Sequence, residues 1–138
     1  MPESHFFSYV VSMRDTDATG LVFHPRFLEI LTAAREDYWG SLGFSHAILG
    51  STYHSQLVVY KMELSFQKPS HLRDRLVVET VLKKIRGAKI SMKQLIWLDS
   101  MKTELIMESN LIYAYVDKNT LLPKIIPAGV LKFFGIDA

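Results

Sequence analysis

Residues 13–28 read MRDTDATGLVFHPRFL. Within this stretch Asp15 and Asp17 flank a threonine, Gly20 follows the second acid by three residues, and a His-Pro step comes shortly after. A loop that only joined a strand to a helix would not need this arrangement, because one turn residue would be enough. The stretch therefore predicts a polar loop leading into a helix, in which the two acids would fit either ordinary turns or a functional site.

The helix pattern begins at the His-Pro step and stops at Gly43. Proline suits a first helical turn because its missing N–H would have no partner there in any case. From Pro25 onward apolar residues recur at helical spacing, at Phe27, Leu28, Leu31, Ala34, Tyr38 and Leu42. The spacing predicts one long helix with His24 as its N-cap residue.

Strand patterns occupy most of the remaining chain. Aromatic and β-branched residues in 5–12 predict a first strand before the acidic loop. After an irregular segment at 45–56, alternating residues predict four long strands joined by tight turns, at 57–66, 75–85, 88–98 and 104–117. The tail at 127–136 could form a short helix or a coil on an edge. This order predicts an α+β fold in which an antiparallel sheet wraps around one helix.

Length and composition limit the class of protein. A chain of 138 residues fits a single domain over 1–138, and 49% hydrophobic residues, 22% charged residues and a net charge of +2 are typical of a globular protein without a nucleic-acid partner. The absence of cysteine excludes disulfides and thiolate chemistry. The first residues lack a secretory signal pattern, and no stretch approaches the ~20 apolar residues of a membrane span. We expect a cytoplasmic protein without a membrane span.

The stretch RDTDATGLVFHPRFLEILTAAREDYW resembles the hotdog-fold thioesterases, in particular the 4-hydroxybenzoyl-CoA thioesterase branch and the short-chain acyl-CoA thioesterases of the Tol-Pal cluster. The residues that carry the resemblance are Asp15, Asp17, Gly20, Leu21, Val22, His24 and the turn Arg86-Gly87-Ala88. The resemblance implies a hotdog fold, with about five antiparallel strands wrapped around one long central helix. It also implies hydrolysis of an acyl-CoA thioester.

The resemblance assigns roles within the acidic loop. Asp17 is expected to act as base or nucleophile, and the backbone N–H of His24 to polarise the thioester carbonyl. Gly20 would permit a close backbone approach or a positive φ. Asp15 is expected mainly to hold the loop through hydrogen bonds, a direct catalytic role being the less favoured alternative, with Arg14 pairing with Asp15 or lowering the pKa of either acid. Both acids would also fit ordinary Asx turns.

Other polar residues carry weaker patterns. Arg86 and Lys89 could bind the phosphates of coenzyme A, although charged turns are also common for solubility alone. The five histidines show no paired ligand spacing, so we expect no metal site, and coenzyme A enters only as part of the substrate. Glu29 and Glu36 share a face of the helix, where solvent exposure is the usual state of glutamate.

The predicted function is hydrolysis of a small or medium acyl-CoA, aliphatic or aromatic. Two alternatives stay open: release of acyl chains from an acyl-carrier protein, and a non-hydrolytic acyl-binding role. The family pairs edge strands of two sheets, which implies a homodimer, with a homotetramer as a further option. The site would then lie at the interface, against a wall around Phe66 to Pro69 of the partner.

Overall fold

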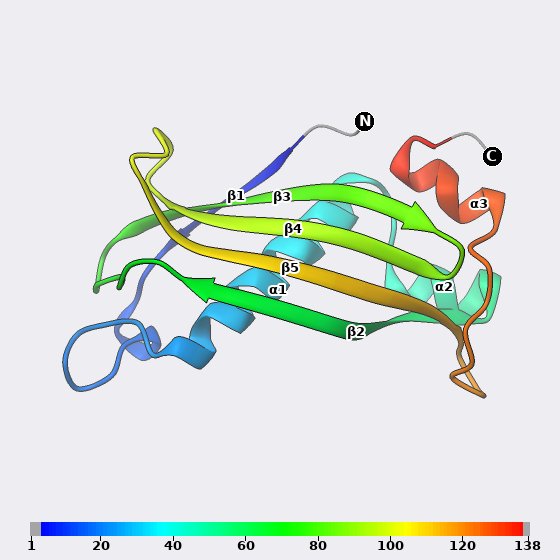
Figure 1. Ribbon diagram of the computed structural model, residues 1–138, viewed down its shortest axis with the longest axis horizontal. Helices are drawn as coiled ribbons and strands as arrows, with labels where there is room; N and C mark the ends of the chain where they lie inside the picture. The colour runs from blue at the N-terminus through cyan, green and yellow to red at the C-terminus, as the bar shows by residue number, and fades with distance from the viewer. Residues whose placement is uncertain (1–3, 137–138) are drawn as a thin grey trace.

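The computed structural model describes residues 4–136. A single antiparallel sheet contains five strands, β1 (His5–Val10), β2 (Ser55–Phe66), β3 (Arg75–Arg86), β4 (Lys89–Leu98) and β5 (Glu104–Asp117). Their order across the sheet is β1-β3-β4-β5-β2 (Figure 1). The first two strands of the chain therefore lie at opposite edges of the sheet.

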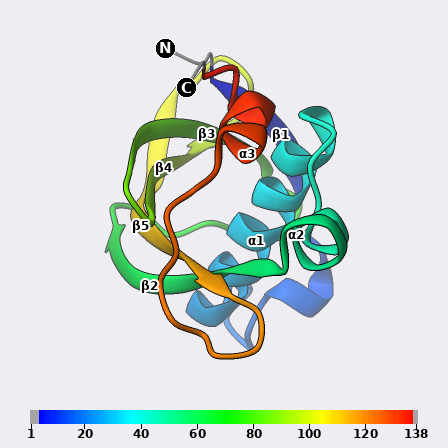
Figure 2. The ribbon, with the colours of Figure 1, turned by 90° about the vertical axis from the view of Figure 1, so that its right-hand side faces the viewer.

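The central helix α1 (His24–Ser41) crosses one face of this sheet, and the sheet curves around it (Figures 1 and 2). Ala34 has no exposed surface, so the small side chain lets the helix approach the strands closely. The other apolar residues that α1 buries recur on the same face, at Phe27, Ile30, Leu31, Tyr38 and Trp39. The predicted α+β fold, a sheet wrapped around one long helix, is confirmed.

The start of α1 differs by one residue from the prediction. Phe23 is the N-cap residue, with an extended backbone, and His24 is the first helical residue. Pro25 therefore takes the second helical position, where the N–H that proline lacks would also have no intrahelical acceptor. His24 consequently contributes a backbone N–H to the first turn of the helix.

The segment at 45–56, predicted to be irregular, contains a second helix, α2 (His46–Tyr53). Ser45 caps it by accepting a hydrogen bond from the N–H of Ile48 at 3.2 Å, and His54 ends it in a left-handed conformation. The helix buries little beyond Leu49, so its apolar spacing is weak in the sequence. The tail forms α3 (Ala128–Leu131) and a 3-10 turn, η2 (Lys132–Phe134).

One charged residue is buried between α1 and the sheet. Arg35 is 5% exposed and donates from Nε to the hydroxyl of Tyr113 at 2.6 Å and from Nη1 to Oε1 of Gln94 at 2.9 Å. Gln94 in turn donates to the carbonyl oxygen of Leu31 and to the hydroxyl of Thr80. Because these bonds have specific geometry, they fix the position of the helix along the sheet.

The loop between β1 and α1 lies at the end of the sheet where β2 ends and β3 begins (Figure 1). Backbone hydrogen bonds hold it there, among them one from Val11 N–H to Asp74 O at 3.0 Å and one from Val22 N–H to Ser70 O at 2.8 Å. The β3–β4 hairpin lies at the opposite end. The acidic loop is thus a fixed part of the fold.

Candidate active site

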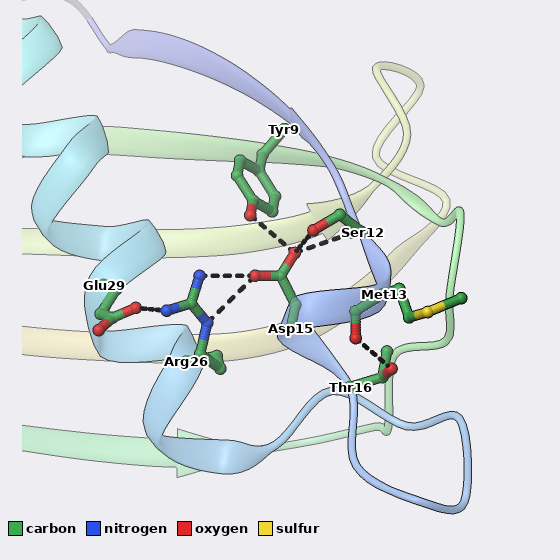
Figure 3. A network of polar contacts seen from close by, with 7 residues as sticks. All are labelled: Tyr9, Ser12, Met13, Asp15, Thr16, Arg26 and Glu29. Atoms are coloured by element: carbon green, nitrogen blue, oxygen red, sulfur yellow. Dashed lines mark hydrogen bonds and ion pairs between the residues drawn. The ribbon is translucent and has the colours of Figure 1, made fainter.

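Asp15 is the centre of a hydrogen-bond network that joins β1, the 3-10 turn η1 (Met13–Asp15) and α1 (Figure 3). The residue is fully buried. Its Oδ2 accepts from the Tyr9 hydroxyl at 2.7 Å and from the N–H and hydroxyl of Ser12 at 2.8 and 3.0 Å. Its Oδ1 accepts from Nε and Nη2 of Arg26 at 3.1 and 2.7 Å. Both carboxylate oxygens are therefore occupied by donors of the protein.

The environment of Asp15 keeps it charged. Burial acts to raise its pKa, because it disfavours the charged form. The hydrogen bonds from Ser12, Tyr9 and Arg26 outweigh burial and lower the pKa to about 2. A buried carboxylate that is ionised and saturated with donors is suited to holding a loop, which is the role that the sequence predicts for it.

Residues 16–22 form a small hairpin that projects from this anchor. Asp17 N–H donates to Leu21 O at 2.9 Å, and Gly20 N–H donates to Asp17 O at 3.1 Å, which closes the turn. Gly20 has a φ of +82°, a conformation that side chains with a Cβ rarely adopt. The second arm pairs with 70–72, through Leu72 N–H to Gly20 O at 3.2 Å and a bridge between Leu21 and His71. The hairpin is held on both sides.

Asp17 opens the turn of this hairpin and is exposed. Its Oδ1 accepts from the Thr19 hydroxyl and from the Thr19 N–H, the latter at 2.8 Å. The hydroxyl first and then the N–H lower the pKa of Asp17, so its carboxylate is charged at neutral pH. This geometry is an Asx turn, and it also orients the carboxylate. Both Thr19 groups bind Oδ1, and Oδ2 accepts no hydrogen bond within residues 4–136.

The start of α1 supplies a donor and an apolar wall. The His24 N–H makes no hydrogen bond within residues 4–136, as expected in the first turn of a helix. Next to it lies a shallow hollow whose walls include Phe27, Phe66 and Lys68. The Phe66 ring centre is 6.4 Å from that of His24 and 6.0 Å from that of Phe27. The wall at 66–69, expected from a partner, is formed here by the chain itself.

Arg86 and Lys89 are not brought to this loop. They pair with each other across the β3–β4 hairpin, at the far end of the sheet from 11–23 (Figure 1). The twelve residues of β3 separate them from the loop by ~40 Å at the usual rise per residue. Lys89 lies with its Nζ 4.4 Å from the centre of the Tyr60 ring. Within one chain these cations cannot share a site with Asp17.

The ion-pair partner of Asp15 differs from the predicted one. Arg14, expected to pair with it, is exposed and makes no ion pair in the described part of the chain, and Arg26 takes that place. Arg26 is the third residue of α1, so its side chain reaches back from the first turn. A cation near a helix N-terminus is unfavourable for the helix dipole. The ion pair with Asp15 offsets that cost.

Two further observations concern the described residues. No group of three or more His, Cys, Asp or Glu side chains within 4–136 has the arrangement needed to hold a metal ion. None of the helices in that range is both long enough and apolar enough to cross a membrane.

Comparison with known proteins gives one family. A family model described as the thioesterase superfamily, 4HBT, matches residues 19–105. This match includes Gly20 and His24 and begins two residues after Asp17. An acyl-CoA thioesterase YbgC from Haemophilus influenzae is 28% identical to the chain over 130 residues, which cover 93% of each protein.

Solved structures agree with this family. A probable thioesterase from Bartonella henselae is 26% identical, with a TM-score of 0.81 over 91% of this chain and 100% of that one. A 4-hydroxybenzoyl-CoA thioesterase variant in complex with 4-hydroxybenzoyl-CoA has a TM-score of 0.85 over 95% of this chain and 98% of that one. At 18% identity the latter shows the shared fold alone.

Proposed function

The chain belongs to the thioesterase superfamily, and we propose that it is an acyl-CoA thioesterase. The substrate is a small or medium acyl-CoA, aliphatic or aromatic. The observation that carries the proposal is a charged, exposed Asp17 on a fixed hairpin whose second arm leads directly into the unpaired His24 N–H. The similarity to the YbgC thioesterase over 93% of the chain supports it.

In the proposed reaction Asp17 acts on a water molecule. Its carboxylate accepts a proton as the water oxygen attacks the thioester carbonyl, and the carbonyl oxygen becomes an oxyanion. The His24 N–H donates to that oxyanion, aided by the positive end of the α1 dipole. Collapse of the intermediate breaks the C–S bond, and the thiol leaves with the proton that Asp17 holds. The products are a carboxylic acid and free coenzyme A.

A second route has the same balance and uses Asp17 as the nucleophile. Its free oxygen would attack the carbonyl, expel the thiolate and form a mixed anhydride, which water then hydrolyses. Gly20 supports either route, because its φ of +82° closes the turn that presents Asp17. Repeated turnover in oxygen-labelled water tests the second route, since label enters the Asp17 carboxylate only when water attacks an anhydride at the Asp17 carboxyl carbon.

A homodimer is the proposed working unit. The outer edge of β2 has no partner strand in the described residues, and it carries exposed apolar side chains at Val58, Val59 and Tyr60. Pairing two β2 edges would satisfy the free backbone groups and cover these side chains. Association of two dimers into a tetramer is compatible with the same edge pairing.

The dimer also gives Arg86 and Lys89 a role. An antiparallel pairing of two β2 edges turns the partner sheet around, so its β3–β4 hairpin points toward the first chain's acidic loop. Arg86 and Lys89 of the second copy are then the proposed ligands of the coenzyme A phosphates. Coenzyme A is bound only as part of the substrate, and no other cofactor is invoked.

A thiol-release assay over aliphatic and aromatic acyl-CoAs, with an acyl-carrier-protein thioester alongside, tests the function. Turnover of free acyl-CoAs that depends on Asp17 is the expected result. Turnover of the carrier-protein thioester alone would instead show that the substrate is an acyl-carrier-protein thioester. Saturable binding of acyl-CoAs without thiol release would instead show a non-hydrolytic acyl-binding protein.

A further inference from the structure

We infer that Arg26 is a positioning residue for the proposed hydrolysis: by its ion pair with Asp15 it sets the His24 N–H against the Asp17 carboxylate. This inference rests on the proposed function. Figure 3 shows the pair between the first turn of α1 and the turn η1, with Tyr9 and Ser12 on the other carboxylate oxygen.

Spacing along the chain links the ion pair to both reacting groups. His24 precedes Arg26 by two residues within the same helical turn, and Asp17 follows Asp15 by two residues in the hairpin arm. Each proposed reacting group is therefore two residues from one member of a single ion pair. No hydrogen bond within the described residues joins Asp17 to His24, so their relative position depends on what joins the two segments.

The geometry of the ion pair restricts the guanidinium to one orientation. Arg26 directs two donors, Nε and Nη2, to the same oxygen of Asp15, and its Nη1 donates to Glu29. The group is thus held from both sides, which a single-point contact would not achieve. One backbone bond accompanies the pair, from Phe23 N–H to Asp15 O at 2.8 Å. Together they join the start of the helix to the acidic segment.

Removal of the Arg26 side chain would leave Asp15 without part of its donor set. Oδ1 would lose both of its donors while the carboxylate remains fully buried. Because a buried carboxylate that has lost its ion-pair partner is unfavourable, Asp15 would take up a proton or shift toward solvent. Either change moves the hairpin arm that carries Asp17 relative to the first turn of α1. Arg26 itself is 22% exposed and is directed to the carboxylate, so it is not assigned a substrate contact.

The test compares Arg26→Met with Arg14→Met. The second variant is a control with the same change of charge, since Arg14 is exposed and makes no ion pair within 4–136. Misplacement of a reacting group by ~1 Å can cost ~10²-fold in rate, so kcat of Arg26→Met should fall by ~10-fold to ~10²-fold with KM changed by less than about threefold. Arg14→Met should stay within about twofold of the wild type. A kcat loss of less than about threefold in Arg26→Met, or a change in KM alone, would overturn the inference.

Two further variants separate positioning from general stability. Arg26→Lys keeps the charge but not the two-donor geometry, so its kcat should lie between those of the wild type and Arg26→Met, and it decides the test if Arg26→Met fails to fold. In an Asp17→Asn background, Arg26→Met should lower kcat by less than a further factor of about three, because the carboxylate that Arg26 positions is already lost. Full activity of Arg26→Lys, or losses that multiply, would contradict positioning.

A measurement independent of activity completes the test. Hydrogen exchange of the Phe23 amide, which donates to Asp15 O, should accelerate at least ~10-fold in Arg26→Met and stay unchanged in Arg14→Met. Unchanged exchange in both variants would overturn the inference while leaving the thioesterase proposal intact. A wild-type protein that releases no thiol from any thioester would instead contradict the proposed function itself.

Discussion

Asp15 and Asp17 are two residues apart, yet their environments differ. Asp15 is fully buried and accepts hydrogen bonds from Tyr9, Ser12 and Arg26. Asp17 is exposed, and within residues 4–136 its side chain is bound only by the hydroxyl and N–H of Thr19. In a plain strand, residues two apart point to the same face and would share one environment. The 3-10 turn that ends at Asp15 breaks this alternation. One carboxylate therefore holds the loop, while the other stays exposed for the role proposed for it.

Replacing Asp17 by Asn should reduce kcat by at least ~10²-fold, because it removes the charge while keeping the size and the Thr19 contact. Thiol release from the best acyl-CoA measures the effect. The free energy of unfolding should change little, since Asp17 is exposed. Near-wild-type turnover would remove Asp17 from the mechanism.

Replacing Asp15 by Asn should change the pH dependence of stability. The folded-state pKa of Asp15, about 2, lies below the ordinary value of 3.8, so its contribution is present above pH ~4 and is lost as the pH falls toward 2. The shift corresponds to about 2 kcal/mol. Urea unfolding at several pH values should therefore show wild type and Asp15→Asn converging on acidification. If the difference in the free energy of unfolding between the two proteins stayed constant down to the folded-state pKa, Asp15 would not be the source of the pH dependence.

Replacing Gly20 by Ala should lower both stability and activity. Gly20 has a positive φ, and a Cβ added there would meet no atom within 4 Å, so the cost is that of the backbone conformation, about 1 kcal/mol. Gly43→Ala is the matched control, because Gly43 also has a positive φ and open space but lies just beyond the C-terminal end of α1, away from the acidic loop. Both variants should lose similar stability in urea, and only Gly20→Ala should lose turnover. Equal turnover of the two variants would show that the backbone conformation at Gly20 does not affect the hydrolysis.

Replacing Val59 by Lys should weaken the proposed dimer. Val59 is 47% exposed on the free edge of β2, and a charge there would be buried when two edges pair. Met101→Lys is the control, since Met101 is exposed in the β4–β5 turn. Sedimentation at micromolar concentration should show dimers for wild type and Met101→Lys and monomers for Val59→Lys, with activity following the dimer. A wild-type protein that is monomeric and fully active would contradict the proposed dimer.

The sequence predicts a helix or strand correctly where its apolar residues repeat with a single regular spacing. The helix from His24 and the four long strands follow from apolar spacing, because each buries one continuous face against the same core. The helix at 46–53 was missed because it buries mainly Leu49 and shows no such face. The order of the strands could not be read from periodicity at all, since the pairing of His5 with Thr80 joins residues far apart in the chain.

For the candidate site, too, the sequence identifies residues that are close together in the chain but not contacts that depend on the fold. Asp17, Gly20 and His24 are neighbours in sequence, and the structure places them on one hairpin and the helix that follows it. Arg26 was missed because its contact with Asp15 passes across the start of the helix, where no short-range pattern applies. Arg86 and Lys89 were grouped with the site by residue type, and the sheet places them at its other end.

The strand order has a consequence for synthesis on the ribosome. β1 and β2 both precede the strands they pair with, because β1 needs β3 and β2 needs β5, which ends at Asp117. The first half of the chain, which carries the acidic loop and α1, therefore emerges with no sheet to pack against. Such a high contact order delays native structure until most of the polypeptide has left the exit tunnel. During that interval the apolar face of α1 stays exposed to solvent.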